Sequence, residues 1–328
     1  MTFYRSIIRQ AIITTWHNKY LWFFGLFATL LASNFEIELV NRFTNGGATP
    51  YDFQRWLETG IFNGQTWVEF FQLATTNTVM FISIIILVTV LIILAITIIW
   101  LAVVSQIALV INSNKIISGG KKSINPKNHD TTLGLQEGRK YLWPVLGLHL
   151  LVRILVYGLA ATTVIPVLLW ASKQTLSFSL AYLVIFLVFF AIALAISLVA
   201  KYAIAAITLK GQSFSQAISS SWDLFWKNWL VSLEMAFILF AISFIAAFII
   251  LIVILNIGTL FKVIFLITLG INYILWVFTV IIGTLICFAI LIIGGSIVTV
   301  IQTTAWVTLY NQLNGKGVES KLERVFGD

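Results

Sequence analysis

Four ionisable side chains lie inside long apolar stretches, and they are the residues of this chain best placed to do chemistry. They are His149, Arg153, Lys201 and Glu234. A charge at the centre of a bilayer costs at least about 2.5–3.5 kcal/mol, so such residues mark binding sites or buried ion pairs. His149 and Arg153 are four residues apart and share one helical face. With Lys201, they would give a site with surplus positive charge, which suits an anion or a lipid headgroup.

A structural interpretation of the same residues stays open. Lys201 and Glu234 lie near the ends of their apolar stretches, where long side chains can extend to the membrane surface. An Arg153–Glu234 ion pair would hold two helices together. We therefore keep two functional classes: a non-enzymatic scaffold, accessory or regulatory protein, and a transporter or lipid-handling protein with its site near Arg153. The sequence shows no deep array of polar residues, and this favours the first class.

The sequence contains none of the familiar enzyme motifs. There is no His-Glu-x-x-His, Gly-x-Ser-x-Gly, Walker loop or Gly-x-Gly-x-x-Gly pattern. Intramembrane catalysis would need paired acids, and Glu234 is the only acid inside an expected span. The single cysteine, Cys287, allows neither a disulfide framework nor a thiolate metal site. We therefore expect no catalysis, no metal and no cofactor.

The elements that must hold these residues are membrane-spanning helices. Hydrophobic residues make up 60% of the 328-residue chain and charged residues only 10%, far below the roughly 25% charge of soluble domains. Because a span needs about 20 apolar residues, the sequence predicts a single all-α polytopic domain, residues 1–328. Its six expected spans lie at about 20–34, 79–112, 144–170, 178–207, 229–255 and 275–310.

The basic residues predict the orientation of these spans. Most of the 20 Lys and Arg residues fall on the side that holds both chain termini, and such a bias marks the cytoplasmic face. The loop 35–78 is then external, and it carries two aromatic segments of helical spacing, at 50–57 and 65–73. The net charge of +8 is explained as an orientation signal, so we expect membrane lipids and not nucleic acid as partners.

A short basic-aromatic motif recurs where apolar stretches begin. It reads Lys19-Tyr20-Leu21-Trp22, then Lys140-Tyr141-Leu142-Trp143, and more loosely Lys227-Asn228-Trp229-Leu230. An amphipathic stretch precedes each copy, and Ala11-x4-Trp16 matches Ala217-x4-Trp222 in spacing. Such helices lie in the plane of the membrane interface. The expected interfacial anchors are Trp16, Lys19, Tyr20, Trp22, Lys140, Tyr141, Trp143, Trp222, Lys227 and Trp229.

These patterns predict three repeats, at about 1–115, 131–210 and 212–316. Each would consist of an interfacial helix followed by a helical hairpin, and all three would have the same orientation. Independent origin of the motifs stays an alternative, because interfacial physics favours Lys and aromatic residues at any point of entry. Residues 1–33 also have the features of a cleaved secretory signal, but recurrence of the motif at an internal position favours a retained span.

Two of the expected spans are too long for a bilayer core of about 30 Å. These are 79–112 and the final helix, and both should project into the cytoplasm. Residues 257–312 could hold one span or two, with a break near residues 270–272. We expect one long final helix preceded by an interfacial lead-in at 257–273.

The repeated amphipathic helix with its tryptophan elbow resembles a known group of proteins. The residues that carry the resemblance are Ala11-x4-Trp16 with Lys19-Tyr20-Leu21-Trp22, and Ala217-x4-Trp222 with Lys227-Asn228-Trp229-Leu230. The pattern is similar to polytopic bacterial membrane proteins related to the membrane domain found beside glycerophosphodiester phosphodiesterases. This resemblance implies six helices, a prokaryotic plasma membrane and a connection to lipids. It implies no catalytic residues, and the chain contains no soluble phosphodiesterase domain.

Overall fold

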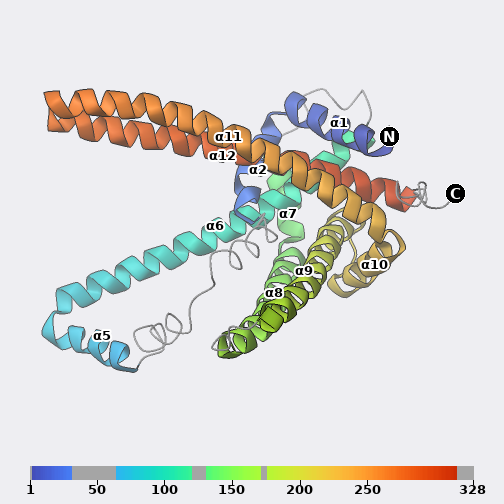
Figure 1. The fold of residues 1–328 in the computed structure, drawn as a ribbon, viewed down its shortest axis with the longest axis horizontal. Coiled ribbons are helices and arrows are strands. Elements are labelled where there is room, and N and C mark those ends of the chain that lie inside the picture. The colour runs from blue at the N-terminus through green and yellow to red at the C-terminus, as the bar shows by residue number, and fades with distance from the viewer. Residues whose placement is uncertain (1, 32–63, 120–130, 171–175, 316–328) are drawn as a thin grey trace. The chain divides into compact units, whose positions relative to one another are not determined.

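The computed structural model describes residues 2–31, 64–119, 131–170 and 176–315, and these residues form helices joined by short breaks (Figure 1). The expected all-α fold of long apolar helices is confirmed. In chain order the helices are α1 (Thr2–His17), α2 (Tyr20–Leu31), α5 (Gly64–Thr76), α6 (Thr78–Ser118), α7 (Thr131–Lys140), α8 (Leu142–Trp170), α9 (Leu176–Lys210), α10 (Phe214–Lys227), α11 (Trp229–Ile271) and α12 (Tyr273–Gly315).

Five helical segments among the described residues are long and apolar enough to cross a membrane. They are Thr78–Ser118, Leu142–Leu159, Leu187–Lys210, Trp229–Ile271 and Tyr273–Gly315. Helix α2 is apolar but only 12 residues long. Of the loop expected at 35–78, the structure describes residues 64–78. The span expected at 20–34, which is the first in chain order, therefore stays a prediction.

The structure corrects the expected lead-in at 257–273. Residues 257–271 of this segment continue α11, which runs unbroken for 43 residues to Ile271. The chain then breaks at Asn272, where the side-chain oxygen accepts a hydrogen bond from the Ile274 backbone N–H at 2.8 Å. This cap begins α12, a single helix of 43 residues. The expectation of a break at 270–272 and of one long final helix is confirmed. The residues before the break continue α11 because they contain no Pro, and the Thr259 and Thr268 hydroxyls bond to backbone oxygens of the helix itself.

Helices α6 and α12 both exceed the length that one bilayer requires, as expected. They contain 41 and 43 residues, or roughly 60–65 Å at about 1.5 Å per residue. In each helix the first half is apolar and exposed, whereas the second half is buried and contains polar residues. The second halves therefore supply packing surfaces in addition to length.

The chain forms two compact units. The first comprises residues 1–32, 102–146 and 198–328, and the second comprises residues 33–101 and 147–197. Helices α6, α8 and α9 each contribute residues to both units.

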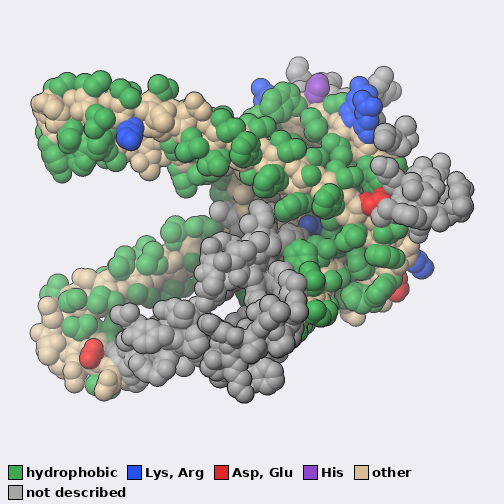
Figure 2. Space-filling model, in the orientation of Figure 1, with side chains coloured by type: hydrophobic (Ala, Val, Ile, Leu, Met, Phe, Trp, Pro, Cys, Tyr) green, Lys and Arg blue, Asp and Glu red, His purple; other side chains and the backbone are tan. Residues whose placement is uncertain are grey.

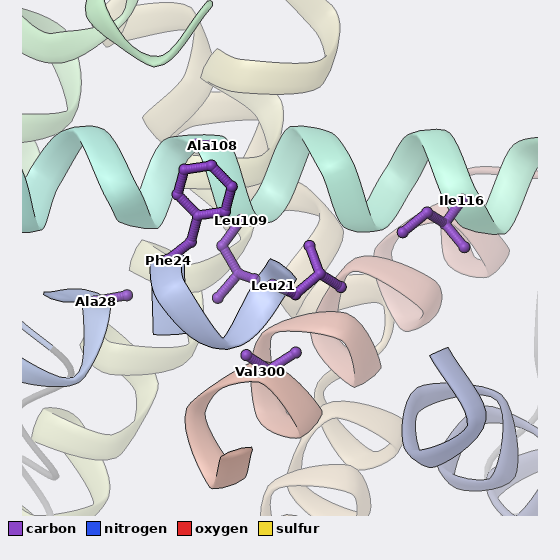
Figure 3. Packing of buried hydrophobic residues seen from close by; sticks show 7 residues of the cluster. All are labelled: Leu21, Phe24, Ala28, Ala108, Leu109, Ile116 and Val300. Carbon is purple, nitrogen blue, oxygen red and sulfur yellow. The ribbon is translucent and has the colours of Figure 1, made fainter. Parts of the chain in front are cut away.

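An apolar cluster in the first unit joins three helices (Figure 3). Leu21 and Phe24 of α2 are fully buried against Ala108 and Leu109 of α6, and Val300 of α12 completes the contact. Ala28 and Ile116 extend the same cluster. The cluster brings the beginning of the chain together with a helix almost 300 residues later.

Helices α2 and α12 approach closely because small residues face one another. A Cβ atom added to Gly25 would lie 2.6 Å from Val300 Cγ2 and 2.7 Å from the Ser296 carbonyl oxygen. Thr29 and Thr299 exchange a hydrogen bond at 2.9 Å in the same interface. Close backbone contact of this kind is the main way that helices associate in lipid.

Helices α11 and α12 form an antiparallel hairpin within the first unit (Figure 1). Gly283 receives Phe261, and Gly294 receives Ile250, so the two helices pack along the hairpin. Large apolar side chains cover its outer surface from Phe237 to Ile293 (Figure 2). A surface of this composition belongs in lipid.

The second unit contains the amphipathic helix α5. Trp67, Phe70 and Phe71 form an aromatic group on this helix, and Phe70 contacts Phe81 at the start of α6. Asn77 separates the two helices and accepts a hydrogen bond from the Met80 N–H at 3.1 Å. The expected surface helix at 65–73 is thereby confirmed, and the one expected at 50–57 lies outside the described residues.

Candidate functional site

The amphipathic helices α1 and α10 end in the same way, at an asparagine elbow. The Asn18 side chain donates to the Thr14 carbonyl oxygen at 2.9 Å, and the Asn228 side chain donates to the Leu224 carbonyl oxygen at 3.1 Å. Each asparagine side chain thus bonds to a carbonyl in the last turn of its helix, where backbone carbonyls begin to run out of helical donors. Its own carbonyl then accepts the first backbone hydrogen bond of the next helix, from Leu21 in α2 and from Ser232 in α11.

The elbows set a common register for α1 and α10. Counting back from Asn18, the fully buried residues are Thr15, Ala11 and Ile7; counting back from Asn228 by the same steps, the buried residues are Phe225, Ser221 and Ala217. The two helices therefore bury equivalent faces. This register pairs Trp16 with Trp226, whereas the sequence spacing had paired Trp16 with Trp222.

In helix α7, Tyr141 holds the elbow position that Asn18 holds after α1, and the buried residues before it have the same spacing. Gly138 and Gly134 are buried three and seven residues before it, as Thr15 and Ala11 are before Asn18. A Cβ atom on Gly138 would lie 2.7 Å from the Val104 backbone oxygen in α6, so the two backbones nearly touch. The order of short helix, elbow and long helix thus occurs at α1–α2, α7–α8 and α10–α11, while a threefold duplication with bounds 1–115, 131–210 and 212–316 stays a prediction.

The expected anchor residues divide into two groups. The side chains of the first group are exposed, and this group contains Trp16, Lys19, Lys140, Trp143, Trp222, Lys227 and Trp229. The second group is half-buried and contains Tyr20, Trp22 and Tyr141. Trp22 packs against Trp16 with ring centroids 5.7 Å apart, and its indole N–H donates to the Thr15 carbonyl oxygen at 3.0 Å. Trp22 therefore fixes the elbow, whereas Trp16 remains available to the surroundings.

Two of the four expected site residues, Lys201 and Glu234, lie in the first unit. The Lys201 ammonium lies 5.1 Å from the centre of the Trp306 ring, a cation–π contact. The Glu234 carboxylate accepts a hydrogen bond from the Tyr4 hydroxyl, which ties α1 to α11. Both residues are half-buried. Each therefore has a defined role in holding helices together.

The other two, His149 and Arg153, lie on α8 in the second unit. His149 is half-buried, whereas Arg153 is exposed. Around Arg153 the helix surface is apolar, with Leu150, Ile154 and Leu155 also exposed. An exposed guanidinium on an apolar helix requires a polar partner such as a headgroup, water or a neighbouring helix. The structure thus divides the four residues between the two units, and their meeting at one site stays a prediction.

Sequence reasoning missed the polar residues along the second half of α12. They bond to side chains of three other helices: Thr299 to Thr29 of α2 at 2.9 Å, Thr304 to Ser113 of α6 at 3.1 Å, Asn311 to Asn114 of α6 at 2.6 Å, and Gln302 to Ser243 of α11 at 2.6 Å. Polar side chains that join helices in this way are typical of membrane proteins. A run of Thr, Gln and Asn within an apolar helix was the available signal.

Helix α9 is joined to α12 by a second set of contacts. Tyr202 meets Trp306 edge to face and lies next to Tyr310, and its hydroxyl hydrogen-bonds to Ser232 of α11 at 2.7 Å. Lys210 donates to Asn314 at 2.8 Å and lies over the Tyr310 ring. Helix α12 is therefore the helix on which α2, α6, α9 and α11 converge within the first unit.

The long apolar helices define this chain as an integral, multi-pass membrane protein. Among the described residues, no group of three or more His, Cys, Asp or Glu side chains is placed to hold a metal ion. Comparisons with family models, with curated proteins and with solved structures find no match.

Proposed function

We propose that this membrane protein is a non-enzymatic scaffold or accessory protein whose role depends on the packing of its helices. The observation that carries the proposal is the use made of polar side chains in the first unit. Thr304, Asn311 and Gln302 of α12 each bond to a side chain of another helix. Polar groups that substrates or reactions would require are here engaged in holding helices together, which supports a structural role.

The surface that such a scaffold offers to other membrane proteins is the α11–α12 hairpin. Phe237, Phe244 and Phe248 are exposed on α11, while Met235 and Leu239 of the same helix are buried. The exposed stripe is available for lateral contact within the bilayer. We place the protein in a prokaryotic plasma membrane with both termini in the cytoplasm, which agrees with the distribution of basic residues and with the resemblance to the phosphodiesterase-associated membrane domain.

A second function, lipid or anion handling, is favoured by one specific observation. Arg153 is exposed on an apolar stretch of α8, four residues from His149. A guanidinium in that setting suits the phosphate of a lipid headgroup or a transported anion.

Photo-crosslinking in intact cells separates the two functions. A photoreactive residue replaces Phe237 or Phe244, and replacement of the buried Met235 serves as the matched control. The scaffold function predicts a discrete protein adduct at both exposed positions and none at Met235. Adducts with lipid alone at both positions would overturn it.

The second function is tested by the phospholipid that copurifies with the chain. Retained lipid, and uptake of a labelled anion into proteoliposomes, should fall in the Arg153→Ala variant. If both measurements match the unaltered protein, lipid or anion handling at this site is excluded.

A further inference from the structure

The exposed side of helix α1 includes a stripe of residues that is basic in one part and apolar in another. The exposed residues Arg5, Arg9, Ile12 and Trp16 follow one another at steps of four and three, and the exposed Lys19 lies three residues further on, in the elbow after the helix ends at His17. Residues at these steps lie on one helical face. The stripe is therefore basic in its first half, apolar in its second half and basic again at the elbow.

The opposite face of α1 fixes the direction in which this stripe points. Ile7, Ala11 and Thr15 are completely buried, and α1 packs on α12. The Tyr4 hydroxyl adds a hydrogen bond to Glu234 of α11. With three turns of the helix held in this way, Arg5 and Arg9 cannot turn inward, and they face the surroundings of the first unit.

Helix α10 presents the same stripe without the arginines. In the register set by Asn18 and Asn228, Arg5 and Arg9 correspond to Ser215 and Ser219, which are both exposed. Ile12, Trp16 and Lys19 correspond to three exposed tryptophans of the α10 elbow, namely Trp222, Trp226 and Trp229. The two helices therefore share an apolar half and differ in the charge of the other half.

The charge difference extends to each helix as a whole. Helix α1 contains two arginines and no acidic residue, whereas α10 contains Asp223 and Lys227, whose charges cancel. Arginine presents a planar fork of donors that fits phosphate oxygens in a bidentate manner. Two guanidiniums one helical turn apart can thus contact the phosphate groups of neighbouring lipids.

We propose that α1 recognises anionic phospholipids through Arg5 and Arg9, while α10 anchors its elbow in the interface without selecting lipid charge. The apolar half of the α1 stripe leads directly to α2, whose composition belongs in hydrocarbon. Trp16 and Trp22 pack together at this junction, where tryptophan favours the headgroup level. Arg9 and Arg5 lie about two and three turns before Trp16, and they are then level with the phosphates or just outside them.

This arrangement favours a lipid surface over an acidic protein as the partner. Continuity between the basic half, the paired indoles and the apolar helix matches the layers of a membrane surface, from charged headgroups to hydrocarbon. The proposal depends only on the protein being embedded in a membrane, so it stands apart from the scaffold function and from any site at Arg153.

The correspondence between α1 and α10 supplies a matched experiment. The full chain is reconstituted in nanodiscs of phosphatidylcholine with a minor fraction of phosphatidylglycerol, and the lipid retained by the protein is measured by native mass spectrometry. Combining Arg5→Ser with Arg9→Ser gives α1 the serines that α10 has at the equivalent positions, 215 and 219. Retention of phosphatidylglycerol should fall about 10-fold or more, since each basic residue near an anionic surface contributes appreciably, while retention of phosphatidylcholine stays unchanged.

The reverse exchange is the stronger test, because it should confer lipid retention and not remove it. Ser215→Arg with Ser219→Arg should confer added phosphatidylglycerol retention that declines as salt is raised, and Arg5→Lys with Arg9→Lys should retain part of the preference of α1. All substituted positions are exposed, so the thermal unfolding temperature serves to confirm intact folding. Unchanged retention of phosphatidylglycerol in the serine variant would overturn the proposal. Loss of binding to an acidic protein with no loss of retained lipid would overturn it as well.

Discussion

At the scale of single residues, this protein relies on positions where a side chain must be absent. Gly25 and Gly138 lie where a neighbouring helix leaves no room for a Cβ atom, against Ser296 and Val104 respectively. Lipid tails are as apolar as Leu, so burial of large side chains drives helix association only weakly in a bilayer, and close backbone contact matters more. The glycines are thus as important for packing as the leucines of a soluble core.

Replacing Gly25 with Ala should destabilise the protein by about 1–3 kcal/mol, the usual cost of overpacking. The Val300 methyl and the Ser296 carbonyl cannot both move away from the added atom. Thermal unfolding in detergent measures the effect. Gly258→Ala is the control, because nothing lies within 4 Å of the added atom there; equal stability of the two variants would contradict the packing described for α2 and α12.

The contribution of single residues was only partly predictable from sequence. Lys19, Trp16 and Trp229 are recognisable as interfacial residues because Lys and Trp favour membrane interfaces in any fold. The roles of Thr304 and Asn311 depend on which helix faces α12, and that is a property of tertiary packing. The correct pairing of α1 with α10 also required the hydrogen bonds of Asn18 and Asn228, because a helical pattern shifted by one turn matches almost as well.

At the scale of elements, α12 has two functions in one continuous helix. Its first half, from Tyr273, is apolar and exposed, and its second half, ending at Gly315, carries the polar residues that meet other helices. The pattern of apolar residues predicted the length of this helix well. It did not predict the length of α11, because an apolar segment near a break can either continue a helix or lie in the interface.

The bond between Asn311 and Asn114 should contribute a measurable coupling between α12 and α6. A double-mutant cycle with Asn311→Ala and Asn114→Ala is expected to give about 0.6–1.7 kcal/mol, the range found for hydrogen bonds between helices in membranes. Unfolding free energies in a detergent series supply the four values. Strictly additive losses would show that the two amides do not stabilise the folded protein as a pair.

At the scale of the whole molecule, the length of helix α11 in the α11–α12 hairpin can be compared with the thickness of a bilayer. From Trp229 to the exposed Lys262, α11 runs for about 50 Å at 1.5 Å per residue, close to the 40–45 Å of a bilayer with its headgroups once a modest tilt is included. In the proposed orientation, Lys262 would be level with the outer headgroups and Asn272 would lie beyond them. Composition alone predicted the class of protein and most spans, whereas the number of crossings near residues 20–34 depends on residues outside the described ranges.

A cysteine at the tip of the hairpin should therefore be reachable from outside the cell. In a Cys287→Ser background, Asn272→Cys is expected to react with a membrane-impermeant maleimide on intact cells. Lys140→Cys, at an elbow on the other side, should react only after permeabilisation. Labelling of both positions from the same side would overturn the assigned orientation.

The placement of α12 at the centre of the first unit has a consequence for biogenesis. The first two helices leave the ribosome long before the helix that receives Ile7, Ala11 and Gly25 has been synthesised. Until translation reaches the end of the chain, these surfaces have no native neighbour, and they must be shielded by lipid or by the insertion machinery. Chains that stop short of residue 296 would lack the half of α12 that packs on other helices, so premature termination should expose them to membrane proteases.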